Sequence, residues 1–88
     1  MKIFKYGVPL THSFTLDMPE SASILDVQVQ AGRPVIWALV DPDAPTQRRE
    51  FRIYGTGHPI DDTINSAYIG TFQSLSDALV FHLFEVKL

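Results

Sequence analysis

The sequence has 88 residues, of which 45 % are hydrophobic and 19 % charged, a balance typical of one packed domain and not of a disordered chain. It contains no cysteine, which excludes disulfides, thiolate zinc sites and cysteine nucleophiles and fits a reducing compartment. The formal net charge of −3 gives no general attraction for nucleic acid or for an anionic membrane.

The first residues include no apolar stretch of signal-peptide length, and no run of about 18 apolar residues occurs anywhere. We therefore expect a cytoplasmic protein with no membrane partner. At this length one core must hold the whole chain, so we expect a single domain over 1–88 and regard a homo-oligomer as a live alternative to a monomer.

Period-two alternation of apolar and polar residues begins near the start of the chain and is typical of β-strands. A first strand is expected over 3–6 and should end before Pro9. A second strand is expected over 13–17, followed by a turn over 18–22.

The third expected strand is the clearest, because Leu25, Val27 and Val29 alternate with polar residues and should form its dry face. A turn around Gly32 then forms a hairpin. The segment 35–40 is apolar on both faces, so we expect it in the centre of a sheet or covered on both sides.

Two prolines and two aspartates predict a loop over 41–46. Alternation returns over 48–54, and we expect this strand to form a second hairpin with the strand before the loop. Phe51 and Ile53 lie on one of its faces. The opposite face carries Arg48, Glu50, Arg52 and Tyr54.

After a glycine-containing loop, a short strand is expected over 68–73, and Gly70 within it indicates a bulge or a close approach of another backbone. The segment 78–86 favours a buried strand, although Ser76 and Asp77 could cap a short helix there. Together the segments predict an all-β, mainly antiparallel fold: a small sandwich or partly open barrel of about seven short strands, with at most one short helical turn.

The best local candidate for a site is the turn that contains Gly55, Gly57 and His58. Two glycines allow a backbone to approach a ligand or to take positive φ, and a histidine beside Asp61 and Asp62 could act as a base or a metal ligand. The glycine spacing matches neither phosphate-binding loop. The competing interpretation is a tight loop with a solvated histidine.

A basic face is the second candidate, because Arg48 and Arg52 share a strand face with Tyr54. Charge beside an aromatic ring suits a nucleotide, a single-stranded nucleic acid or an acidic protein patch. Glu50 lies between the two arginines on that face, and the competing interpretation is cross-strand charge pairing on a solvent-exposed face. The tentative ligand-binding residues are therefore Arg48, Arg52, Tyr54, Gly55, Gly57 and His58.

Metal binding and catalysis have weaker support. The acidic and histidine side chains that could meet at one end of the sheet lack any metal-binding spacing; they are Asp41, Asp43, His58, Asp61 and Asp62. No Gly-x-Ser-x-Gly elbow occurs. His12 should be exposed in a loop, and His82 should be a sheet histidine with satisfied nitrogens. We expect no metal, no cofactor and no catalysis.

Five phrases spread over nearly the whole chain resemble a family of small uncharacterised proteins found largely in phage and prophage genomes. They are 27–30 (VQVQ), 37–42 (WALVDP), 55–60 (GTGHPI), 68–73 (YIGTFQ) and 79–85 (LVFHLFE). The resemblance implies an accessory or anti-defence factor that acts by binding something inside a bacterial cell. Residues 65–67 and 74–77 lie between the phrases, so we expect them to be loops.

No motif identifies the function, and three hypotheses remain. The first is a non-catalytic protein that binds a host or phage protein. The second is an oligomeric binder of a nucleotide or another small anionic ligand through Arg48, Arg52, Tyr54 and the turn with His58. The third is a metal-assisted hydrolase that uses His58 with one of the two neighbouring aspartates.

Overall fold

The computed structural model describes residues 1–74 and 78–87, and this part of the chain is all-β. Its seven strands are β1 (Lys2–Gly7), β2 (Ser13–Pro19), β3 (Ser23–Gln30), β4 (Arg33–Val40), β5 (Thr46–Gly55), β6 (Ser66–Gln73) and β7 (Val80–Val86). Within the described residues no helix has the length and apolarity needed to cross a membrane. The predicted fold class is confirmed.

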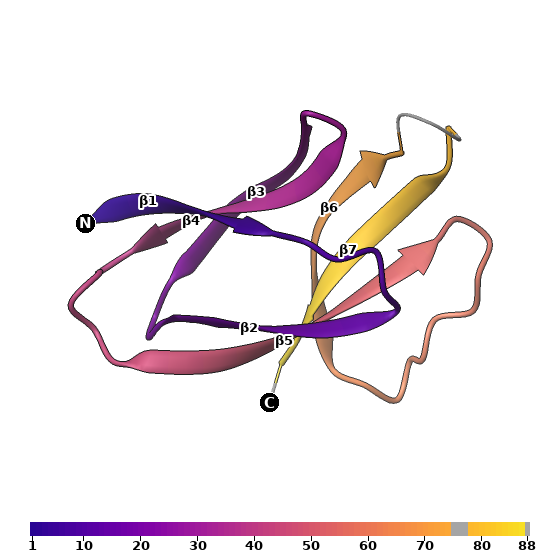
Figure 1. Ribbon diagram of the computed structural model, residues 1–88. Coiled ribbons are helices and arrows are strands. Elements are labelled where there is room, and N and C mark those ends of the chain that lie inside the picture. Colours follow the sequence, from indigo (N-terminus) through magenta and orange to yellow (C-terminus); the bar gives the residue numbers. More distant parts are fainter. Residues whose placement is uncertain (75–77, 88) are drawn as a thin grey trace.

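The strands form two antiparallel sheets that do not close into a barrel (Figure 1). Sheet A has the order β1-β4-β3, and sheet B has the order β2-β5-β7-β6. The edge strands β3 and β6 contact each other where the sheets meet. The Cα atoms span 39 × 34 × 16 Å, and this thin dimension accommodates two layers about 10 Å apart. The fold is a small sandwich.

The predicted hairpin around Gly32 joins β3 to β4. Ala31 and Gly32 both have positive φ, 51° and 78°, which is the backbone of a type I′ turn. This turn matches the right-handed twist of the flanking strands and holds Gln30 opposite Arg33. The next strand, β4, pairs with β1 on one side and β3 on the other, so its predicted central position is also confirmed.

The core lies between the sheets. Met18, Ile36, Val40, Phe51 and Leu83 are completely buried, and together they come from β2, β4, β5 and β7. Each is the inward member of an alternating strand, so burial of one face of each sheet accounts for most of the packing.

Two bulges modify the alternation that the sequence predicted. The register of β3 against β4 shifts between Ile24 and Asp26, so Leu25 is left without a partner and is 52 % exposed. The prediction that Leu25 belongs to the dry face is therefore wrong, because the bulge turns Ile24 inward in its place. The second bulge is at the predicted site, with a shift between Tyr68 and Gly70.

The predicted second hairpin is wrong, because β4 and β5 belong to different sheets. The loop over 41–45 crosses from sheet A to sheet B and is closed by a turn in which Ala44 N donates to Asp41 O at 3.1 Å. As a result β5 pairs with β2 and β7.

Several predicted boundaries also change. Ser66 and Ala67, expected in a loop, are paired with β7 and begin β6. Met18 and Pro19, expected in a turn, complete β2. Over 80–86 the strand prediction is confirmed, whereas the alternative helix cap at residues 76 and 77 lies outside the described residues.

Candidate functional site

The tentative ligand-binding arginines lie on the outer face of sheet B and have acidic partners. Arg48 Nε is 3.6 Å from Asp17 Oδ1, and Arg52 donates to Glu50 Oε2 from Nη2 at 2.9 Å. The hydrogen bond to Glu50 raises the pKa of Arg52. The Arg48–Asp17 pair is the cross-strand charge pairing that the sequence left open as the alternative to an anion site, whereas Arg52 and Glu50 pair within β5.

Tyr54 lies between these arginines and the glycine turn, and it is only 4 % exposed. Its ring makes edge contacts with the rings of His12 and Phe84, at centroid distances of 5.5 and 5.7 Å. The prediction of an open aromatic surface at Tyr54 is wrong, because neighbouring rings on the same face cover it. Arg48 lies seven positions before Gly55, about 23 Å along an extended strand, so it is well separated from the glycine turn, whereas Arg52 lies only three positions before Gly55.

The glycine turn has a specific shape. His58 N donates to Gly55 O at 3.0 Å, and Gly57 has a φ of 85°, which favours glycine. A Cβ on Gly55 would lie 2.8 Å from His58 Nδ1, so the imidazole folds back over Gly55. Both glycines are therefore needed to place His58.

Two hollows flank His58, and we refer to them as the His58 hollows. One, of about 280 Å³, is bordered by Leu79, and the other, of about 240 Å³, by Leu10. They share Gly55, His58 and Phe81 as lining residues. Leu10 and Leu79 are 58 % and 52 % exposed, so each hollow has a large apolar side chain at its margin.

The loops that form the His58 hollows come from distant parts of the sequence. Leu10 lies between β1 and β2, His58 lies between β5 and β6, and Leu79 lies just before β7. The glycine turn was recognisable in the sequence, whereas the two leucines were not, because loops give no periodic signal that would bring them together.

A chain of hydrogen-bonded hydroxyl and imidazole groups lies beside the His58 hollow that Leu79 borders. Tyr68 Oη is 2.5 Å from Thr71 Oγ1, which is 2.9 Å from His82 Nδ1, and His82 Nε2 is 2.8 Å from Thr56 Oγ1. Thr56 also donates to Val80 O. Both nitrogens of His82 are satisfied, as the sequence predicted for a histidine within a sheet.

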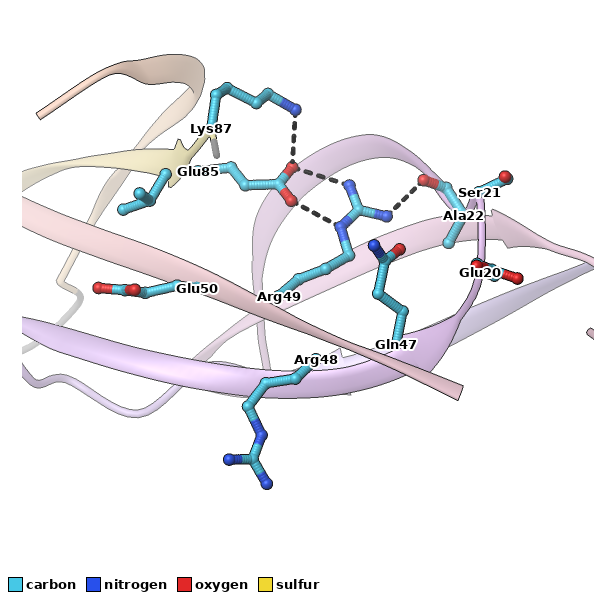
Figure 2. A pocket seen from close by; sticks show the side chains of 10 residues that line it. Glu20, Ser21, Ala22, Gln47, Arg48, Arg49, Glu50, Glu85 and Lys87 are labelled. Atoms are coloured by element: carbon cyan, nitrogen blue, oxygen red, sulfur yellow. Dashed lines mark hydrogen bonds and ion pairs between the residues drawn. The ribbon is translucent and has the colours of Figure 1, made fainter. Parts of the chain in front are cut away.

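A third hollow, of about 420 Å³, lies near the start of β5, at the opposite end of this strand from the His58 hollows, and contains a buried ion pair (Figure 2). Arg49 donates to both carboxylate oxygens of Glu85, from Nε at 2.6 Å and from Nη2 at 2.8 Å, and from Nη1 to Ala22 O at 2.5 Å. Figure 2 shows Arg48 pointing away from this hollow, on the other side of β5.

The ion pair occupies the groups that a ligand would need. Burial by itself would raise the pKa of Glu85, but hydrogen bonds and charge from Arg49, together with Lys87, outweigh burial and lower it. The hydrogen bond to Glu85 likewise raises the pKa of Arg49. All three guanidinium nitrogens of Arg49 donate hydrogen bonds, two to Glu85 and one to Ala22 O, so Arg49 joins β5 to β7 and to the segment before β3. We therefore assign this hollow a structural role.

The Arg49–Glu85 pair was not among the residues predicted from the sequence, although the sequence carries a signal for it. Arg49 alternates in phase with Phe51 and Ile53, and Glu85 alternates in phase with Leu83. A charged residue at an inward position requires a partner of opposite charge. The sequence could therefore indicate two inward charges, but only the pairing of β5 with β7 brings them together.

The acidic residues proposed as metal ligands do not converge. Asp61 accepts hydrogen bonds from Thr63 Oγ1 and from Thr63 N, which lower its pKa. Asp41 caps its own loop by accepting from Asp43 N at 3.0 Å. Over the described ranges no three His, Asp or Glu side chains come together in a way that could hold a metal ion.

A family model described as "Domain of unknown function (DUF7352)" matches residues 1–88. No curated protein and no solved structure matches the chain.

Proposed function

The chain belongs to the DUF7352 family, and we propose that it is a small, non-catalytic phage-type accessory protein that binds a host or phage protein at the His58 hollows. The observation that carries the proposal is the exposure of Leu10 and Leu79 beside two hollows that share His58. Loops held by a rigid sheet are where binding residues concentrate, and exposed apolar side chains beside a concavity suit another protein.

The size of the hollows favours a protein over a small molecule. At about 280 and 240 Å³ they fall below the range of roughly 300–1,000 Å³ typical of ligand pockets. Each can instead receive one apolar side chain of a docked protein, with Leu10 and Leu79 covered at the same time. A partner with two neighbouring apolar side chains therefore fits the site.

The polar groups around the hollows favour binding over catalysis. The ring nitrogens of His82 are engaged by Thr71 and Thr56, and His58 is exposed above Gly55. A hydrolytic nucleophile requires a base that is oriented by a third group and aimed at a reacting centre. Among the described residues His58 has no acidic partner within hydrogen-bonding distance that would orient it.

The cell compartment and the partner class follow from the phage-type resemblance. We place the protein in the cytoplasm of a bacterial host cell, where a component of host defence is the first partner class to test. An inhibitor that occupies a surface of such a protein needs affinity and complementary shape, both of which a small rigid sheet with apolar loops can supply.

The test begins with the tagged full chain as bait in infected bacterial cells. A captured protein is then purified and its affinity for the chain is measured by titration calorimetry. Leu79→Asp should weaken binding at least tenfold, because it places a charge where an apolar side chain is buried. Thr15→Asp is the control, since it makes the same charge change at an exposed position on β2 that borders neither hollow and lies outside sheet A.

Two results would overturn the proposal. One is an equal loss of affinity for Leu79→Asp and Thr15→Asp. The other is a folded chain that captures no protein but shows a large thermal shift with a nucleotide, and that loses this shift in Arg52→Ala. This second result would support the anionic-ligand hypothesis instead.

A further inference from the structure

Sheet A has an outer face that is unusually apolar. In the register of the sheet, Ile3 lies opposite Leu39, and Lys5 lies opposite Trp37. Along β4 the alternate residues Val35, Trp37 and Leu39 share this face, and none of the three belongs to the core cluster between the sheets. They form a second apolar surface on the opposite side of β4 from the core.

This face is open in the described part of the chain. Ile3 is 61 % exposed, Leu25 is 52 % exposed, and Trp37 and Leu39 are half-buried, whereas Val35 at one end of the face is only 6 % exposed. An antiparallel sheet with one solvated face normally alternates apolar inward and polar outward residues. The outward apolar residues of β4 depart from that pattern, and a tryptophan at the centre of such a face is a typical interface anchor.

The charges on this face are arranged so that it complements itself. One row across the sheet contains Lys5 on β1, Trp37 on β4 and Asp26 on β3. By backbone position the row has a lysine on one edge strand, an aromatic residue at its centre and an aspartate on the other edge strand, and the lysine side chain reaches across β4 to Gln30 on β3. After a half-turn about an axis along β4, the lysine of one copy of this row faces the aspartate of the other copy.

We propose that the outer face of sheet A is an interface between two copies of this chain, packed face to face about a two-fold axis parallel to β4. The rotation places β1 of one copy over β3 of the other and keeps each row at its own level. Trp37 then meets Trp37 of the second copy, and Lys5 faces Asp26 twice. Packing of this kind matches the aligned arrangement of sheets in sandwiches.

The new pair leaves the contacts of Asp26 in place, because its two oxygens accept from Val27 N and Gln28 Nε2 and each has a further lone pair. The contacts of Lys5 are the ones that change. Its ammonium group donates to Gln30 Oε1 at 2.8 Å and lies 5.9 Å from the centroid of the Trp37 ring, and the hydrogen bond is exposed. An exposed hydrogen bond of this type is worth little and is replaced by an ion pair with Asp26 of the other copy. Burial of the apolar face then provides most of the association free energy.

The interface leaves the proposed binding site free. The residues that line the His58 hollows lie on β5, on β7 and in loops, and none lies on β1, β3 or β4. The dimer would therefore present two sets of hollows and could bind two copies of a partner, or one symmetric partner with higher avidity.

Sedimentation velocity over a concentration series of the full chain tests the proposal. The expected result is a reversible shift from a species of 9.9 kDa to one of twice that mass. Trp37→Ala should raise the dimer dissociation constant at least tenfold, because it removes the central contact on both copies. Circular dichroism confirms that the variant retains the β fold.

A charge-swap experiment tests the geometry itself. Lys5→Glu alone and Asp26→Lys alone each place like charges opposite each other twice, so both variants should be monomeric at concentrations where the native chain is a dimer. Mixing the two variants restores both pairs and should restore the dimer. Glu20→Lys makes the same charge change as Asp26→Lys in an exposed turn and should leave the dimer unchanged.

A native chain that remains monomeric throughout the series overturns the inference. So does a dimer that is insensitive to Trp37→Ala, or a mixture of the two charge variants that stays monomeric. If another protein covers this face, the native chain is monomeric alone and Trp37→Ala weakens binding to that protein, a pattern that also rejects the two-fold interface. None of these results bears on the His58 hollows, which are tested by Leu79→Asp.

Discussion

Arg49 and Glu85 form a doubly hydrogen-bonded ion pair in which the two side chains are only 13 % and 9 % exposed. The pair lies on the inner face of sheet B, in a chain with a small core, and it also holds the backbone at Ala22. A buried carboxylate and guanidinium stabilise a fold only while both are present, because either one alone is an uncompensated charge.

We predict that Glu85→Leu and Arg49→Met each reduce the free energy of unfolding by about 3 kcal/mol, because each leaves the other charge buried without its partner. The loss of unfolding free energy in the double variant should be clearly smaller than the sum of the two single losses, because two apolar side chains then fill the same space and no charge is left unpaired. Urea unfolding of the four chains measures this difference. Strict additivity would show that the pair does not act as a unit.

The same pair predicts a pH dependence of stability. The pKa of Glu85 is lowered in the folded chain, whereas in the unfolded chain it returns to about 4.5. Its contribution is therefore fully present above about pH 4.5 and is lost as the pH falls through the lower folded value. Unfolding free energies measured over this range should rise with pH. The slope should be smaller in Glu85→Gln, in which the group cannot titrate.

Gly70→Ala should destabilise the fold by about 1–3 kcal/mol, the usual cost of overpacking in a filled interior. The new Cβ would lie 2.6 Å from Val27 Cγ1, where β6 approaches β3. Thermal unfolding measures the loss. Val27→Ala removes the clashing methyl, so the double variant should be more stable than the sum of the single effects predicts. No recovery in the double variant would contradict the contact.

Ala31→Asn should stabilise the chain by about 1 kcal/mol, because asparagine accepts positive φ at lower cost than alanine in a type I′ turn. Ala31 has a φ of 51° and is exposed, so the change affects no packing. Gly32→Ala is the opposite case: it adds a Cβ in open space at a φ of 78° and should be destabilising. Denaturant midpoints that move in the same direction for both variants would contradict this explanation.

The strands themselves were predictable because alternation is a local property. A strand with one buried face places every second side chain in the core, and this pattern is visible without knowing which strand lies next to it. The hairpin at Gly32 and the bulge at Gly70 were predictable for the same reason, since each depends on the conformational range of one or two residues. Leu25 shows the limit: one unpaired residue reverses the phase of a strand.

The candidate site was predicted only in part. The glycine turn around His58 was recognisable because two closely spaced glycines indicate a tight turn, and the histidine between them and two aspartates is a chemically reactive side chain. Leu10 and Leu79 joined it only through the fold. Of the arginines assigned to the same site, Arg48 lies far along β5, and both Arg48 and Arg52 have acidic partners. Sequence order alone does not give these distances.

By itself, then, the sequence determined an all-β domain, the approximate strands and the tight turns, because these depend on the properties of neighbouring residues. Only the tertiary structure decided that β4 and β5 belong to different sheets, that Tyr54 is covered and that Arg49 meets Glu85. Those outcomes depend on which surfaces are buried against each other across long sequence separations. The arrangement adopted is the one with the lowest free energy for the whole packed chain, which no local segment determines.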